Sequence, residues 1–359
     1  MTAIHARHFT MPFALALLGV VALPASAAEF DAKSYFSGKT VNIVVGTASG
    51  GAFDRTARIV AQVLGDHFPG NPKVVVQNRP GGGGLTAIRF VMNGKPDGLN
   101  VTTINPVRSV APWLWGNQSQ GIDPFKAKWV GMPIYDHLPN AIYIRRDVAA
   151  SWQDVLKLGR PLKVPAQNPT SAGRGQVGPL MVEMSGGPMK IIYGYDGGAA
   201  EYMAAMDRGE VDGTSSANER NVPAVFPQWI PQKFIVPIFW YGAEPDRDFL
   251  KALDAPMPPN IKQIVDAPAT RWQAFDAVME THRTSRAFVM HADTPAGMHQ
   301  AWTAAFKAAI LDPKYTDLME KAGDNPAYGP PEAMEEMINV VRQLPADALE
   351  SFKKLVGEE

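Results

Sequence analysis

The stretch Gly46 to Arg58, GTASGGAFDRTAR, carries residue types that could hold an anion. It follows the apolar run Val41–Val45 and places two adjacent glycines, Gly50 and Gly51, shortly before Asp54. Glycine lets a ligand approach the backbone N–H groups, and a helix that starts there directs the positive end of its dipole at the same place. The stretch therefore predicts a strand, a glycine turn and a helix N-terminus that bind a carboxylate. The expected ligand contacts are Ser49, Gly50, Gly51, Ala52 and Phe53.

Asp54 is a negative charge inside a predicted anion site. We include it among the site residues, but in a supporting role. A carboxylate in this position is better suited to accept backbone N–H bonds as a helix cap, or to hold ordered water, than to touch a ligand carboxylate. A plain cap with no ligand nearby is the alternative interpretation.

Glycine turns recur where other predicted strands end, at Gly81–Gly84, Gly173–Gly175 and Gly197–Gly198. Arg174 is suited to a forked contact with a second carboxylate, although an exposed loop arginine fits its surroundings equally well. Asp196 could accept a hydrogen bond from a ligand hydroxyl or amine. The further expected ligand contacts are Gly81, Gly82, Asn105, Ser171, Gly173, Arg174, Asp196, Gly197, Ser215 and Ser216.

Nucleotide binding is a weaker interpretation of the second turn. Gly82, Gly84 and Ala87 fit a dinucleotide fingerprint. That fingerprint belongs on the first strand–helix unit, with an acidic residue ending the next strand. Here it falls on the second unit, and Asp97 precedes the next strand, so we expect no cofactor.

A hydrolase is the second alternative. Gly213, Ser215 and Ala217 approach a nucleophile elbow, with His282, His291 or His299 as a possible base. The final glycine of that motif is missing and no loop is a distinct oxyanion donor. The seven histidines show no metal-binding spacing, so we expect neither catalysis nor a metal.

The N-terminus has the pattern of an export signal. Arg7 precedes an apolar core, Met11–Leu23, and Ala25-Ser26-Ala27 gives a small-residue cleavage site. That core is too short to span a bilayer comfortably. We expect residues 1–27 to be removed near Ala27/Ala28 and the mature protein to reach the periplasm.

The composition of the mature part excludes several classes of partner. Without Arg7 the chain has 33 basic and 35 acidic residues, and this near-neutral balance argues against nucleic acid or an anionic membrane surface. The absence of cysteine excludes disulfides, thiol nucleophiles and thiolate metal sites. An exported chain without disulfides suits a Gram-negative periplasm.

Strand and helix patterns alternate in two series, which predicts an α/β fold with mainly parallel sheets flanked by helices. The first series has strands at 40–46, 71–78 and 99–105, and the second at 140–147, 162–167, 189–198, 209–216 and 233–241. The tail from Thr294 has helical periodicity. Two lobes facing one another would bring the glycine turns onto a shared cleft. The expected parts are lobe 1 from 28 to 144, lobe 2 from 145 to 240, and a hinge return to lobe 1 from 241 to 359.

Several stretches resemble, in the expected order, motifs of the Bug (TctC-like) periplasmic solute-binding proteins of tripartite tricarboxylate transporters. They are GGAFD (50–54), VVVQNRPGGGG (74–84), KPDGLNVTTIN (95–105), YGYDGGAAEYMAAMDRGEVDG (193–213) and the late SRAFVMHADTPAGMHQAWTAAFKAAILDP (285–313). The resemblance implies a two-lobed, type II-like binding protein, a dicarboxylate or aromatic acid as ligand, and the transporter's membrane subunits as partners. We expect a monomer. A receptor that presents its ligand to a sensor kinase is compatible with the same fold.

Phe53 departs from the family pattern, in which many members have Thr or Ser before the loop aspartate. The departure removes a side-chain hydroxyl contact to the ligand. It favours a ligand with an apolar or aromatic body and leaves the ligand class open.

Overall fold

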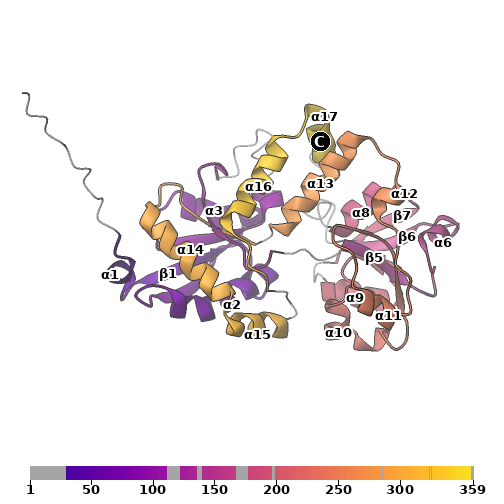
Figure 1. Ribbon diagram of the computed structural model, residues 1–359, viewed down its shortest axis with the longest axis horizontal. Coiled ribbons are helices and arrows are strands. Elements are labelled where there is room, and N and C mark those ends of the chain that lie inside the picture. Colours follow the sequence, from indigo (N-terminus) through magenta and orange to yellow (C-terminus); the bar gives the residue numbers. More distant parts are fainter. Residues whose placement is uncertain are drawn as a thin grey trace, which may run out of the picture. The chain divides into compact units, whose positions relative to one another are not determined.

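The computed structural model describes residues 30–110, 122–135, 140–166, 177–195, 199–284, 286–322, 324 and 326–356. Within these ranges it has an α/β architecture of mixed sheets flanked by helices, which confirms the expected fold class (Figure 1). The predicted export signal lies outside the described residues. None of the described helices is both long and apolar enough to cross a bilayer.

A five-stranded sheet contains the first three predicted strands. In spatial order its members are β2 (Lys73–Asn78), β1 (Thr40–Val45), β3 (Asn100–Ile104), β10 (Ala287–Met290) and β4 (Lys128–Gly131). Strands β2, β1 and β3 are parallel, whereas β10 runs antiparallel to both of its neighbours. The chain therefore returns to its first sheet late in the sequence.

Helices α2 (Ala52–His67) and α14 (Ala296–Ile310) lie side by side against this sheet (Figure 1). Their packing includes Trp302, which is fully buried, donates from Nε1 to Gly98 O at 2.7 Å, and meets the Phe68 ring edge-on. Burial of such a large aromatic side chain makes a substantial hydrophobic contribution. It attaches the late helix firmly to the first sheet.

The second series of strands is divided between two smaller sheets. Strand β5 (Asn140–Arg145) lies between β8 (Gly213–Thr214) and β9 (Ile235–Tyr241), antiparallel to both, and β6 (Leu162–Ala166) pairs in parallel with β7 (Met189–Tyr193). The expectation of mainly parallel sheets is thus correct for β6 and β7 but wrong for β5. The direction in which the chain re-enters a sheet depends on distant strands, which a local pattern does not specify.

Asp212 joins the two smaller sheets. Its carboxylate accepts two bonds from Arg160, at 2.7 and 2.9 Å, and one from the backbone N–H of Lys163 at 2.8 Å. Asp212 is itself only 5% exposed, so these charge-assisted bonds offset the cost of burying it.

The remaining helices cover these sheets and form the tail. Their bounds are α1 (Ala32–Phe36), α3 (Leu85–Met92), α4 (Pro106–Ser109), α6 (Trp152–Leu156), α8 (Val177–Ser185), α9 (Ala199–Asp207), α10 (Asn221–Val225), α11 (Arg247–Ala252), α12 (Ile261–Ile264), α13 (Ala269–Arg283), α15 (Pro313–Lys321), α16 (Pro331–Arg342) and α17 (Ala346–Val356). Short 3₁₀ turns lie at η1 (Gly82–Gly84) and η3 (Pro227–Trp229). Helix α13 packs against both α16 and α17.

Candidate functional site

The first glycine turn leads directly into α2, whose N-cap is Gly51. Gly50 has φ +89°, a left-handed conformation that favours glycine, whereas Gly51 is extended with φ −72° and ψ 168°. No side chain caps this helix. The N-terminus of α2 is therefore not covered by a side-chain oxygen from its own cap, and its N–H groups suit an anion.

Asp54 accepts a backbone N–H bond, as the sequence indicates, but the donor precedes the helix. Its carboxylate accepts from Gly50 N at 2.8 Å, from Asn78 Nδ2 at 2.8 Å and from Arg58 Nε at 3.0 Å. The Asp54 side chain is 2% exposed, and Arg58 also donates to Asn78 Oδ1 at 2.9 Å. Asp54 thus joins the glycine turn, α2 and the end of β2 instead of capping the first helical turn.

These bonds predict an acid-dependent loss of stability. Burial acts to raise the pKa of Asp54, but the bonds from Arg58, Gly50 and Asn78 outweigh it and lower the pKa from 3.8 to about 2. A lowered pKa stabilises the folded state above pH 3.8, and this stabilisation, about 2 kcal/mol, is lost as the pH falls toward 2. We therefore expect the stability difference between wild type and Asp54→Asn to shrink across that range, in urea titrations at successive pH values.

Asp317→Asn is the matched control for the pH titration, since Asp317 is 58% exposed and pairs with Lys321 within its own helix. Its difference from wild type should stay small throughout. An Asp54→Asn difference that does not change between neutral and acid pH would contradict the assigned role of Asp54.

The second glycine turn, Gly81–Gly84, has positive φ at all four positions: 133°, 55°, 67° and 105°. Only glycine adopts such a run without strain. Gly84 is the N-cap of α3, which also lacks a side-chain cap. A Cβ added to Gly46 would lie 2.6 Å from Gly84 Cα, so the two turns approach each other backbone to backbone.

We call the two turns together, Gly46–Phe53 and Gly81–Gly84, the glycine edge. Since β1 and β2 are adjacent and parallel, their carboxyl ends place both turns at one edge of the sheet. Asn105 follows β3 at the same edge. The structure therefore brings together the predicted contacts of the first lobe: Ser49, Gly50, Gly51, Ala52, Phe53, Asp54, Gly81, Gly82 and Asn105.

Two hydroxyl groups of this region were not anticipated from the sequence. Among the described residues, the buried Oγ1 atoms of Thr47 and Thr103 have no hydrogen-bond partner. Thr47 belongs to the glycine edge, and Thr103 pairs with Val45 in the sheet beside it. A buried hydroxyl without a partner is costly. The signal in the sequence is weak, because a threonine in a glycine-rich turn or a buried strand is common.

In the second series of strands, Ser215 and Ser216 follow β8. Ser216 N donates to Thr214 Oγ1 at 3.1 Å, and a Cβ on Gly178 of α8 would lie 3.0 Å from Ser215 Oγ. Both serines are thus held in a closely packed turn. The other predicted contacts of this series, Ser171, Gly173, Arg174, Asp196 and Gly197, lie outside the described residues.

The histidines considered for a hydrolase have other contacts. His299 Nε2 lies 2.7 Å from Trp129 O, and His291 Nδ1 accepts the backbone N–H of Asp293 at 3.0 Å. Neither contact involves Ser215. In the part of the chain that the structure describes, no group of three His, Cys, Asp or Glu side chains could hold a metal.

Comparison with known proteins gives one partial relative by sequence and many by structure. No protein-family model matches the chain. The UPF0065 protein in the gbd 5′ region of Cupriavidus necator is 30% identical over 102 residues, which are 27% of this chain and only 29% of that relative's length.

The structural matches extend over most of the chain. A TctC solute-binding protein from Polaromonas has a TM-score of 0.59 at 17% identity, covering 89% of this chain and 99% of that one. The periplasmic binding protein BugD has 0.53 at 21% identity, with 89% and 98% covered. Rpa4515 of R. palustris, solved with adipate, has 0.52 at 19% identity, with 89% and 97% covered. The chain therefore has the two-lobed fold of the periplasmic TctC and Bug solute-binding proteins, the family that its sequence motifs resemble.

Proposed function

We propose that this protein is a periplasmic solute-binding protein that captures a small organic carboxylate and delivers it to a membrane transporter of the tripartite tricarboxylate type. The glycine edge is the observation that supports this most strongly. It combines two helix N-termini without side-chain caps and two glycine turns in backbone contact. The N–H groups at the start of α2 and the positive dipole ends of both helices suit an anion, whereas the N–H groups of Gly84, Leu85 and Thr86 donate to carbonyls of the second turn itself.

The ligand would be held from the other side by the turns of the second lobe. We assign this role to Ser171, Gly173, Arg174, Asp196, Gly197, Ser215 and Ser216. Hinge closure between lobe 1 (28–144 with 241–359) and lobe 2 (145–240) would exclude water from the bound acid. The adipate bound to Rpa4515, a protein of the same fold, agrees with a carboxylate ligand.

The proposal also covers the export of the protein, its location in the cell and its partners. Residues 1–27 would act as an export signal that is cleaved near Ala27/Ala28, leaving a monomer in the periplasm. The membrane subunits of the transporter would be its partners.

Ligand-induced stabilisation tests the proposal. The mature protein is expected to melt at a higher temperature with one class of acid, in a panel of mono-, di- and tricarboxylates, aromatic acids, amides and nucleotides. A ligand at a hundred times its Kd adds about 2.7 kcal/mol to the free energy of unfolding. A shift with nucleotides alone, or with no member of the panel, would contradict the proposal.

Gly51→Val sharpens this test, because position 51 tolerates a side chain. Its φ of −72° is accessible to valine, and an added Cβ would come no closer than 3.6 Å, to Ala48 O. We expect Gly51→Val to fold and to lose the acid-induced shift, since the side chain would stand between the ligand and the backbone N–H groups.

Gly65→Ala is the matched control on the last turn of the same helix. An added Cβ there would contact Pro72 O at 3.5 Å, an ordinary distance. It should leave the acid-induced shift unchanged. A normal shift in Gly51→Val would place the ligand away from this turn.

A further inference from the structure

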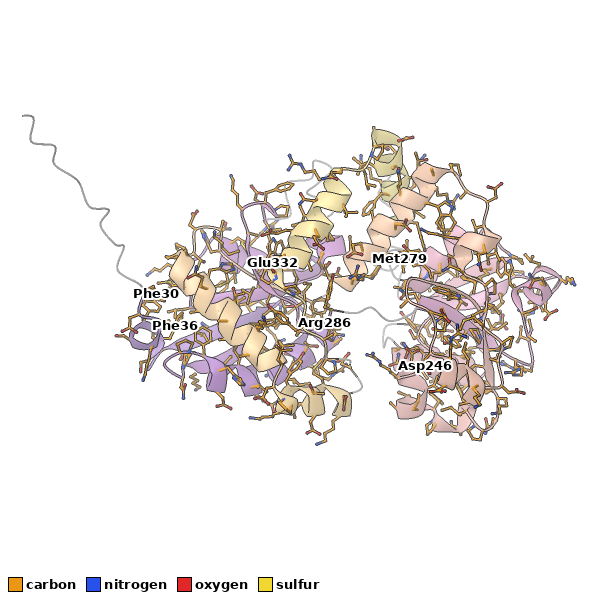
Figure 2. The ribbon with its side chains drawn as sticks, viewed as in Figure 1. Phe30, Phe36, Asp246, Met279, Arg286 and Glu332 are labelled. Carbon is orange, nitrogen blue, oxygen red and sulfur yellow. The ribbon has the colours of Figure 1, made fainter. Side chains whose placement is uncertain are left out.

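Arg286 lies at the same end of the five-stranded sheet as the glycine edge. Arg286, which Figure 2 labels, immediately precedes β10. The first residue of β10, Ala287, pairs with Ile104, the last residue of β3. Since β10 is antiparallel to β3, the start of β10 coincides with the carboxyl ends of the parallel strands. Arg286 thus lies beside the first glycine turn, although it follows that turn by more than 200 positions in the sequence.

The guanidinium group of Arg286 packs against the beginning of α2. It donates to Thr56 Oγ1 at 2.7 Å and to Asp324 Oδ1 at 3.3 Å, and its Cζ lies 6.0 Å from the centre of the Phe53 ring. The side chain is 16% exposed. The two bonds use two of the five N–H groups that a guanidinium carries.

The backbone at Arg286 is in the left-handed region, with φ +60°. Glycine and asparagine adopt this conformation more readily than arginine does. Backbone geometry therefore does not account for an arginine at this position. What the residue supplies is its charged side chain.

The charges around the start of α2 do not cancel. Asp324 pairs with Arg55 at 3.2 Å as well as with Arg286, so two guanidinium groups share one carboxylate. Asp54, the acidic side chain in the first turn of α2, is paired with Arg58. This leaves about one positive charge beside the N-terminus of α2, which itself carries roughly half a positive charge. A dianion compensates this combined charge better than a monoanion does.

We propose that Arg286 is a specificity-determining residue that makes the site prefer ligands with two negative charges. The inference rests on the proposed function of the glycine edge. A dicarboxylate would draw the guanidinium partly away from Asp324, while the Phe53 ring limits the access of water to it. Asp324 then competes with the ligand for Arg286. The Phe53 ring accordingly shields the guanidinium group of Arg286 from water, in addition to any contact with the apolar body of the ligand.

The test is calorimetric titration of adipate and of hexanoate, its monocarboxylate counterpart, into wild type, Arg286→Asn and Asp324→Asn. Asparagine tolerates φ +60°, so Arg286→Asn should fold. We expect it to weaken adipate binding at least tenfold and hexanoate binding less than threefold. Asp324→Asn should strengthen adipate binding, because it removes the competing carboxylate. A merely structural role for Arg286 does not predict opposite signs for these two variants.

Arg247→Asn is the control for a general change in charge, since Arg247 is 77% exposed and pairs with Glu244. It should leave both affinities within twofold of wild type. If Arg286→Asn fails to fold, Arg286→Lys replaces it, because lysine keeps the charge but loses the fork, and a smaller loss of adipate affinity is expected.

The outcomes separate this inference from the proposed function. A wild type that binds no acid of the thermal-shift panel contradicts the function itself. A wild type that binds a carboxylate from that panel but does not prefer adipate to hexanoate overturns the assignment of Arg286 and leaves the function standing. The same holds if Arg286→Asn binds adipate as tightly as wild type does.

Discussion

Replacing Asp54 with alanine is expected to lower the free energy of unfolding by about 3 kcal/mol. The reason is that one 2%-exposed carboxylate accepts bonds from Gly50, Arg58 and Asn78. Its removal takes the acceptor from these three donors and from Ser49 Oγ, which donates to it at 3.4 Å. Urea unfolding measures this loss of stability. Calorimetric titration with an acid that binds the wild type should show a weaker affinity of the variant for that acid, because the Gly50 bond no longer holds the turn before α2.

Asp317→Ala provides the comparison for this substitution. Its carboxylate is 58% exposed and pairs with Lys321 one turn away, a surface interaction worth less than about 0.5 kcal/mol. If the two variants lose equal stability, Asp54 does not organise the glycine edge.

Gly46→Ala is expected to cost about 2–3 kcal/mol and to abolish acid binding. The added Cβ would stand 2.6 Å from Gly84 Cα and 3.0 Å from Gly84 O, both backbone atoms that cannot swing aside like a side chain. The two glycine turns must then separate. Because this contact holds together the two turns that precede α2 and α3, the anion site should be lost along with the stability.

Gly51→Ala separates this steric clash from a general effect of adding a methyl group to the turn. At position 51 an added Cβ comes no closer than 3.6 Å to Ala48 O, so the change in stability should stay within about 1 kcal/mol. Denaturant unfolding of both variants decides the point. Equal stabilities for Gly46→Ala and Gly51→Ala would show that the turns do not depend on close backbone approach.

The sequence was sufficient to predict the units that build the glycine edge. The apolar run after Thr40 predicts β1, and the spacing of Ala57, Val60 and Leu64 predicts α2, because both patterns reflect burial of neighbouring residues along one element. The turn at Gly81–Gly84 was also predicted, because a run of glycines is typical of turns, and the structure adds that all four residues have positive φ. These are local properties, and each is set by residues within a few positions.

Only the tertiary structure determined which distant residues complete the site. Asp54 accepts a hydrogen bond from Asn78, 24 positions away, because β1 and β2 pair in one particular register. Arg286 reaches α2 because β10 re-enters the first sheet in the antiparallel direction, which the sequence pattern around residue 286 does not specify. A short apolar run predicts a buried strand, but the neighbours and the direction of that strand follow from the packing of the whole chain.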